Sequence, residues 1–477
     1  MSASSLPARA VPARRPAPAL LVLLTLAIGF VMAMIDVTAV NTALSDIAAS
    51  LGVPLSGLVW VVDGYTLTFA ALLLAGGALA DRYGPRHVYQ GGLSVFIAGS
   101  VWCALAPSGP ALVAARLLQG AGAALFMPSS LSLLTHAYDD ERTRARMLGS
   151  WSAIVGCSSS IGPLVGGLLV HGFGWRSVFW VNVPIGLLGI ALTQALVPVT
   201  PPARAARALS LLSHGLGVVA LAAMSFVLIE GPVLGLTSMP VGLAALCAVL
   251  AATVLVRRER YGAQPVLPRA LFGSPAFGAA NGVGLLVNLA VFGQLFLLSL
   301  FLQQAGGADA LRTGVRLLPM MACFAIGNVA SGRIAARVGT RPPMLYGLAV
   351  GAAAGLAMMN LSPATPYWLL MAGAMVMNVA IGVAIPGMTA TVMLVAGRSH
   401  ANGAAAALNA NRQIGALVGV ALMGSVLHMV PEWRWRLPLA FGMITLAYAG
   451  AWLLVYRYIR LGRPAGAAGV PVHSAEL

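Results

Sequence analysis

Lysine is absent from this sequence, and charged residues of every kind are scarce. All 28 basic residues are arginine, and charged residues make up only 8% of the 477 positions, whereas a soluble domain carries about a quarter. Hydrophobic residues reach 59%, and the mean hydropathy is +0.89. Many apolar runs are long enough to cross a bilayer as helices, which takes about 20 residues. The sequence therefore predicts an all-α polytopic membrane protein.

Cysteine is also rare, and its distribution excludes a disulfide framework. All four cysteines lie inside apolar runs without a CxxC pair or a nearby histidine: Cys103, Cys157, Cys247 and Cys323. Isolated thiols of this kind are usually small packing residues. No nucleotide-binding loop, metal-ligand cluster or catalytic triad stands out in the sequence. We therefore expect no metal, no cofactor and no enzymatic activity.

The apolar runs number fourteen. The first follows a basic N-terminus, but it is too long for a signal peptide and has no clear small-residue cleavage site, so we expect it to be retained. The predicted spans are 19–44, 55–80, 87–106, 110–136, 147–170, 176–197, 208–230, 238–256, 275–302, 314–336, 343–361, 365–396, 402–430 and 436–456.

The arginines concentrate at one end of the predicted spans. If the N-terminus is cytoplasmic, 21 of the 28 arginines fall on cytoplasmic segments and five on outer loops, while Arg116 and Arg412 lie within spans. Because short cytoplasmic loops are enriched in basic residues, this asymmetry predicts that both termini are cytoplasmic. It also explains the net charge of +16 without a nucleic-acid partner.

A ten-residue pattern occurs twice. Gly77–Arg86, GALADRYGPR, returns 255 residues later as Gly332–Arg341, GRIAARVGTR, with Ala336 in place of Asp81. The pattern joins spans 2 and 3 and again spans 10 and 11, so a shift of eight spans pairs spans 1–6 with spans 9–14. Parallel repeats are typical of secondary transporters.

This register divides the chain into five segments. Two six-helix repeats flank two inserted helices, and the halves are not equivalent because only the first copy of the loop carries an aspartate. The predicted boundaries are 1–18 for a disordered cytoplasmic N-terminus, 19–197 for the N-terminal half, 198–273 for the linker with the inserted helices, 274–460 for the C-terminal half and 461–477 for a cytoplasmic tail.

Five motifs follow one another in the order of a known family. They are Ile35–Leu44 (IDVTAVNTAL), Gly77–Arg86, Leu112–Ala124 (LVAARLLQGAGAA), Ser158–Gly167 (SSSIGPLVGG) and Trp175–Gly186 (WRSVFWVNVPIG). With this set the chain resembles the major facilitator superfamily, and within it the fourteen-helix drug:proton antiporters, over about residues 15–460. It departs from the family pattern at Pro85, Ser158 and Ser213. The resemblance implies the major facilitator fold and alternating access between two six-helix halves.

Ionisable residues inside spans are the candidates for transport chemistry, because a charge in a bilayer costs several kcal/mol. Asp36, Asp63 and Arg116 are predicted at a similar depth, roughly 12 Å below the outer end at 1.5 Å per residue. A carboxylate releases its proton more readily beside a guanidinium than when it is desolvated alone. We therefore expect Asp36 to be the main protonation site, modulated by Arg116. The alternative is a static ion pair between spans 1 and 4.

The remaining ionisable residues have less defined predictions. Asp63 either binds a cationic substrate, shares the proton, or is simply hydrated near the surface. Glu230 is expected to be solvated at the outer end of an inserted helix. Arg412 resembles a family position and is predicted to be a structural or gating cation.

Two glycine-containing motifs are predicted to serve conformational change. The first is a latch in which Asp81 pairs with a loop arginine or with the neighbouring loop at 139–146; the alternative is that its arginines only hold the loop inside. The second gives span 5 a smooth face and a kink, and in the family it is associated with antiport. The latch residues are Gly77, Asp81, Arg82, Gly84 and Arg86, and the antiporter-motif residues are Gly162, Pro163, Gly166 and Gly167.

Together these observations predict an exporter of small amphipathic compounds, such as drugs or toxic metabolites, in the cytoplasmic membrane. The proton gradient would drive it in place of a cofactor, and its partners would be the small-molecule substrate, protons and membrane lipids around a monomer. One alternative is a dedicated exporter of a single natural product or metabolite. Another is a non-transporting membrane sensor or enzyme, which the absence of a catalytic set disfavours.

Overall fold

The computed structural model describes residues 19–459 apart from 139, 200–209, 263–270 and 272. The predicted terminal segments, 1–18 and 461–477, lie outside these residues. The N-terminal half consists of α1 (Ala19–Leu51), α2 (Leu55–Tyr83), α3 (Pro85–Leu105), α4 (Gly109–His136), α5 (Glu141–Phe173), α6 (Ser177–Trp180) and α7 (Asn182–Leu196).

Two further helices, α8 (Leu211–Leu234) and α9 (Met239–Tyr261), separate the halves along the chain. The C-terminal half follows as α11 (Pro275–Leu300), the short π-helix η1 (Phe301–Ala305), α12 (Ala310–Val338), α13 (Arg341–Met358), α14 (Tyr367–Met429) and α15 (Trp433–Tyr458). Local sequence defines several of these starts. Pro85 occupies the first position of α3, where its missing N–H costs nothing, while the side chains of Asp140 and Asp309 cap α5 and α12.

The predicted spans match these helices with three differences. The first helix continues past the predicted end at 44 to Leu51. The run 176–197 is divided into α6 and α7 at Val181. The runs 365–396 and 402–430 join in α14 across a kink at Gly397, where φ is 65°. Glycine adopts such a positive φ without the Cβ clash that other residues meet.

The glycine of the duplicated loop adopts a positive φ in both copies. Gly84 ends α2 with φ 88°, and Gly339 ends α12 with φ 82°. In each copy the next helix starts within two residues, so the loop is a tight reversal that requires a positive φ at its glycine. Both copies of the pattern therefore make the same kind of helix reversal.

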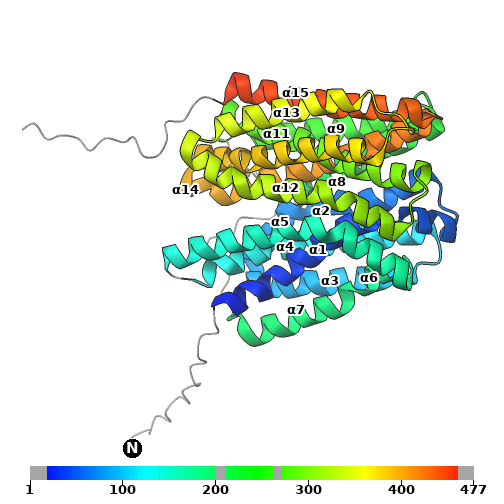
Figure 1. The fold of residues 1–477 in the computed structure, drawn as a ribbon. Coiled ribbons are helices and arrows are strands. Elements are labelled where there is room, and N and C mark those ends of the chain that lie inside the picture. Colours follow the sequence, from blue (N-terminus) through cyan, green and yellow to red (C-terminus); the bar gives the residue numbers. More distant parts are fainter. Residues whose placement is uncertain (1–18, 139, 200–209, 263–270, 272, 460–477) are drawn as a thin grey trace, which may run out of the picture.

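The two halves lie side by side as two groups of roughly parallel helices (Figure 1). Figure 1 also shows that α1 begins and α15 ends at the same end of the bundle. Across the interface, α5 packs against α12 and α2 packs against the second part of α14. In the repeat register, both contacts join the fifth span of one half to the second span of the other.

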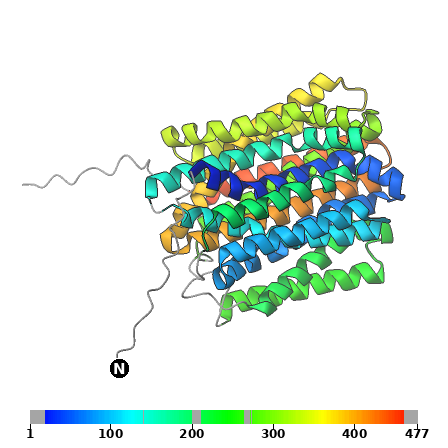
Figure 2. The same cartoon turned by 90° about the horizontal axis from the view of Figure 1, so that it is seen from below.

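The inserted pair α8 and α9 lies along one side of the bundle (Figure 2). Its apolar residues face outward, as Leu246, Val249 and Leu250 on α9 illustrate with exposures of 55–63%. Among the described helices, twelve are long and apolar enough to cross a membrane. These twelve do not include α13. They also do not include α5, in which only Ser160–Phe173 forms an apolar segment.

Glycine contacts hold the C-terminal half together, and they make a test of the packing. A Cβ at Gly415 on α14 would overlap the main-chain carbonyl of Leu285 on α11, whereas one at Gly172 on α5 would meet nothing within 4 Å. We expect Gly415→Ala to lower the stability of the folded protein by about 1–3 kcal/mol, because two backbones must move apart. Gly172→Ala should be neutral. Thermal melting in detergent, followed by size-exclusion chromatography, measures both; equal melting temperatures would contradict this packing.

Candidate functional site

The carboxylate of Asp36 lies deep in the N-terminal half. Because α1 continues to Leu51, Asp36 is fifteen residues from its end, or about 22 Å at 1.5 Å per residue, deeper than the sequence predicted. Its side chain is fully buried. The long α1 therefore places a carboxylate in the interior of the half, out of contact with water.

Three hydrogen-bond donors from α4 and α7 surround this carboxylate. Arg116 on α4 donates from Nη1 to Oδ2 of Asp36 at 2.5 Å and to Oε1 of Gln119 at 2.7 Å. Asn182 on α7 and Gln119 donate to Oδ1 of Asp36 at 2.9 and 3.3 Å. Arg116 also donates from Nε to the carbonyl of Val61 on α2 at 3.0 Å. Both carboxylate oxygens are thus hydrogen-bonded, which a buried ion pair needs if it is not to destabilise the fold.

Aromatic rings complete the surroundings of the guanidinium. Its central carbon lies 4.7 Å from the ring centre of Tyr65 and 5.8 Å from that of Phe179. A desolvated cation gains most from such faces. The cation is therefore held from three sides, by the carboxylate, the amide of Gln119 and the two rings.

The structure brings together the predicted Asp36 and Arg116, and it adds residues to which the sequence analysis gave no role. Gln119 also donates to Ser100 at 2.7 Å, so the network extends to α3. Gln119 and Asn182 both stand within motifs that carried the family resemblance. Their polarity within apolar runs was the available signal, but only the fold reveals that they point at Asp36.

Asp63 on α2 is fully buried, so the alternative in which it is simply hydrated is wrong in this conformation. Within the described part of the chain, neither of its carboxylate oxygens has a hydrogen-bond partner. An ionised carboxylate buried in this way would be very unfavourable. Asp63 is therefore a group that requires a proton, a cation or a ligand.

Glu230 is partly exposed, and it makes a contact with α2 that the sequence analysis did not predict. Its side chain is half-buried, and its Oε1 accepts a hydrogen bond of 2.8 Å from Nε1 of Trp60 on α2. Trp60 directly precedes Val61, whose carbonyl accepts a hydrogen bond from Arg116. The Glu230–Trp60 bond therefore attaches α8 to α2 close to the residues around Asp36. A second bond, from Ser425 to the carbonyl of Leu228 at 2.7 Å, joins α8 to the C-terminal half.

The latch loop is anchored to the last helix of its half. Arg86 is buried and donates to both the carbonyl and the side-chain oxygen of Gln194 on α7, each at 3.0 Å. Arg82 is exposed and lies over the ring of Tyr83 at 5.6 Å. Asp81 is exposed and also engaged in an interaction. Gly84 supplies the reversal, and Gly77 has open space around it.

The antiporter motif on α5 packs between α1 and the other half. Gly162 faces Thr38, and a Cβ at Gly166 would lie 2.6 Å from Oγ1 of Thr42. On another side of α5, a Cβ at Gly167 would lie 2.6 Å from the carbonyl of Ala310. The carbonyl of Pro163 lies against Gly314 in the same contact with α12. The motif therefore connects the helix of Asp36 to the interface between the halves.

Arg412 on α14 has no carboxylate partner within the described residues. Its Nε is buried without a hydrogen bond, while the neighbouring Asn411 donates to Asn281 on α11 at 3.0 Å. Arg412 therefore lies next to a contact between α11 and α14, and its role as a structural or gating cation stays a prediction. In the region that the structure describes, no three potential metal ligands cluster.

Hydrogen bonds also join the halves at the end of the bundle opposite to the start of α1. Ser299 and Gln303 donate to the carbonyl of Asn41 at 3.1 and 3.3 Å. The main-chain N–H of Ser45 donates to the side chain of Gln303 at 3.3 Å. This conformation is therefore closed between α1 and the α11–η1 segment at that end.

The buried pair makes a prediction about stability. Arg116→Met leaves Asp36 as a buried charge without its cation, and we expect a loss of about 3–5 kcal/mol. Adding Asp36→Asn should recover much of that loss, because the remaining amide groups can bond to one another. Arg312→Met, which breaks an exposed pair with Asp309, should cost at most about 1 kcal/mol. Thermal melting of the four proteins measures this; a double variant no more stable than Arg116→Met would argue against a coupled pair.

Comparison with known proteins agrees with this architecture. The family model described as "Major Facilitator Superfamily" matches residues 26–420 and again 283–476. The methylenomycin A resistance protein of Bacillus subtilis is 48% identical over 439 residues, which cover 92% of this chain and 94% of that protein. The multidrug resistance protein Stp of Mycobacterium tuberculosis is 36% identical, over 86% of this chain and 76% of its own.

Solved structures show the same fold. The xylose transporter XylE from E. coli, in an inward-open conformation, superimposes with a TM-score of 0.66 at 12% identity, and the match covers 94% of this chain and 98% of that one. At this identity the likeness concerns the fold alone. Because the family model and a relative of nearly equal length both match most of the sequence, the chain belongs to the major facilitator superfamily.

Proposed function

We propose that this protein is a proton-coupled antiporter that exports small amphipathic compounds across the cytoplasmic membrane by alternating access. The observation that carries the proposal is Asp36, a buried carboxylate whose bonding partners come from other helices of the same half. Relatives named for methylenomycin A resistance and multidrug resistance support export as the direction. The proton gradient replaces any cofactor, and the monomer is the working unit.

Protonation of Asp36 is the proposed coupling step. A proton on this carboxylate removes the ion pair, and Arg116 then keeps only neutral partners, Gln119, the Val61 carbonyl and the rings of Tyr65 and Phe179. The free energy of the whole cluster therefore depends on whether Asp36 carries a proton. Asp63, two residues before Tyr65 on α2, is the second candidate, either for a shared proton or for a cationic part of the substrate.

The topology of the proposal has fourteen membrane crossings with both termini in the cytoplasm. The crossings beyond the twelve apolar helices are α5 and α13, which are equivalent in the repeat to the second part of α14 and to α3. α5 packs against α1 of its own half and α12 of the other half, and α13 packs against α14 and α15. The excess of arginine at the end where α1 begins supports this orientation. With this orientation, the hydrogen bonds that Asn41 accepts from Ser299 and Gln303 hold the two halves together at the outer side of the membrane.

A dedicated exporter of one natural product remains a second candidate. The specific observation that favours it is the 48% identity, over nearly full length, to a protein named for resistance to a single antibiotic. The identity to a protein named for multidrug resistance is lower, at 36%. The two candidates share the proton-coupling site and differ only in the range of compounds.

The coupling test is substrate-driven proton movement in proteoliposomes. With a pH-sensitive dye inside, either methylenomycin A or the cationic dye ethidium is added to protein reconstituted with and without a pH gradient. We expect proton flux with the wild type and background flux with Asp36→Asn. The matched control is Asp46→Asn, an exposed carboxylate on the same helix, which should behave as wild type. Undiminished flux from well-folded Asp36→Asn would refute the assignment, and a response to methylenomycin A alone would favour the dedicated exporter.

The latch makes a separate prediction about rate. We expect Asp81→Ala to insert and melt normally but to transport more slowly, because the acidic contact at the exposed end of α2 biases the two conformations. The second copy of the loop already has alanine at the equivalent position 336, so the fold tolerates this residue. Initial rates of ethidium efflux from cells with equal protein levels measure the effect. A wild-type rate would leave the loop with a topological role only.

A further inference from the structure

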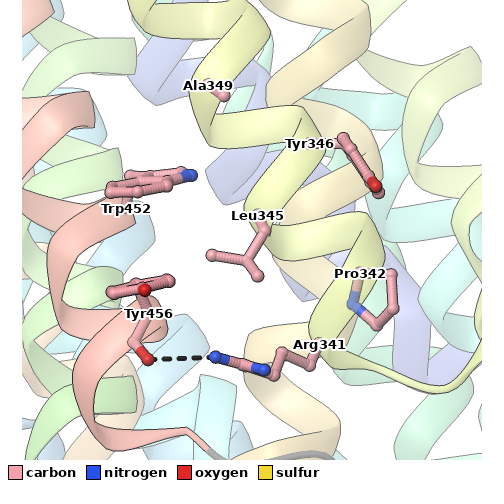
Figure 3. Close-up of a pocket in the computed structure, with 7 residues that line it drawn as sticks. All are labelled: Arg341, Pro342, Leu345, Tyr346, Ala349, Trp452 and Tyr456. Atoms are coloured by element: carbon pink, nitrogen blue, oxygen red, sulfur yellow. Dashed lines mark hydrogen bonds between the residues drawn. The ribbon is translucent and has the colours of Figure 1, made fainter.

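A groove lies between α13 and α15, away from the polar network. Its volume is about 380 Å³. Figure 3 shows the rings of Trp452 and Tyr456 along one wall, Leu345 opposite them, and Arg341 at one end. Tyr346, also on its lining, is 75% exposed, so the groove opens outward from the bundle. In a membrane, that exterior is lipid.

The walls of the groove suit a hydrocarbon chain. The rings of Trp452 and Tyr456 are stacked, with centroids 5.1 Å apart and planes inclined by 7°. The two stacked rings together form an apolar wall along α15. Leu345 and Ala349, one turn apart on α13, give the facing wall an aliphatic character. Rings at this level of a membrane helix commonly lie where acyl chains meet headgroups.

The end of the groove carries a positive charge that has no ion-pair partner among the described residues. Arg341 donates from Nη2 to the carbonyl of Tyr456 at 3.0 Å, as Figure 3 shows, but its Nε is buried without a hydrogen bond. Between positions 310 and 475 the sequence has one acidic residue, Glu432, which lies at the opposite end of α15 and pairs with Arg434. Within the described residues of this half, the carboxylates Asp309 and Glu432 pair with other arginines and not with Arg341.

Comparison with the first repeat shows that this arrangement is particular to the second. Arg86, the equivalent of Arg341, donates to both the carbonyl and the side-chain amide of Gln194. In the second copy the corresponding main-chain acceptor is the carbonyl of Tyr456. The side chain of Tyr456 lines the groove and accepts no hydrogen bond from Arg341. The second copy thus has one acceptor fewer and an apolar groove beside the cation.

We propose that this groove binds a phospholipid with an anionic headgroup. The phosphate accepts hydrogen bonds from Arg341, and one acyl chain lies along Trp452 and Tyr456. Arg457, exposed in the last turn of α15, adds to the positive field at the same end. The apolar walls favour a lipid over free phosphate as the source of the anion. The site is independent of proton coupling at Asp36, so either proposal can fail alone.

Native mass spectrometry of the protein from mixed micelles tests this directly. The probes are phosphatidylglycerol and phosphatidylcholine with identical acyl chains. We expect the wild type to retain phosphatidylglycerol preferentially, and Arg341→Gln to lose roughly tenfold in its retention, the effect of about one charge-assisted hydrogen bond. Arg337→Gln, exposed four residues earlier and outside the groove lining, is the matched control and should retain the lipid as the wild type does.

A second variant separates lipid binding from any effect on the Arg341–Tyr456 contact. Ala349→Phe fills the aliphatic wall and leaves the guanidinium intact, so it should also lose phosphatidylglycerol. Three outcomes would each overturn the proposal. Arg341→Gln could retain as much phosphatidylglycerol as the wild type, or it could lose no more than Arg337→Gln. The third outcome is undiminished phosphatidylglycerol binding by Ala349→Phe. Displacement of the lipid by millimolar inorganic phosphate would also overturn it, because it would show that the groove contributes nothing.

Discussion

The ion pair between Asp36 and Arg116 is the constraint on which the N-terminal half depends. Two charges taken out of water are tolerated only when their remaining bonding positions are filled, and here the partners come from α2, α4 and α7. These helices must therefore approach closely. Gly120 allows this, because any side chain there would overlap Tyr65 and Thr68 on α2. The polar cluster and the tight packing are consequences of each other.

The two halves share a scaffold but differ in charge. Both loops reverse at a glycine with positive φ, and in both the loop arginine donates to a carbonyl on the last helix of its half. The buried carboxylates, Asp36 and Asp63, belong to the first half only, whereas Arg412 lies in a half whose acidic residues stand at helix ends. The two halves therefore share a loop geometry, and the two fully buried carboxylates lie in the first half.

Periodicity and composition predicted the helices and the two glycine turns well, because long apolar runs and glycine turns are local signals. The pairing of Asp36 with Arg116 was also within reach, since few charges occur in spans. The depth of these charged residues in the helices and the identity of their neighbours could not be predicted from the sequence. The end of α1, the burial of Asp63 and the contact of Glu230 with Trp60 depend on which side of each helix meets a neighbour. Gln119 and Asn182 were visible as polar residues, but their common target was not.

The antiporter motif gives the ion pair a route to the interface between the halves. Thr38 and Thr42 lie two and six residues beyond Asp36 on α1, and they pack against Gly162 and Gly166 with no room for a side chain between the helices. Because this contact leaves little free space, a displacement of α1 presses directly on α5. The neighbouring Gly167 rests on the start of α12. A change in the protonation of Asp36 that tilts α1 must therefore either carry α5 along α12 or open that contact, and both outcomes change how the two halves meet.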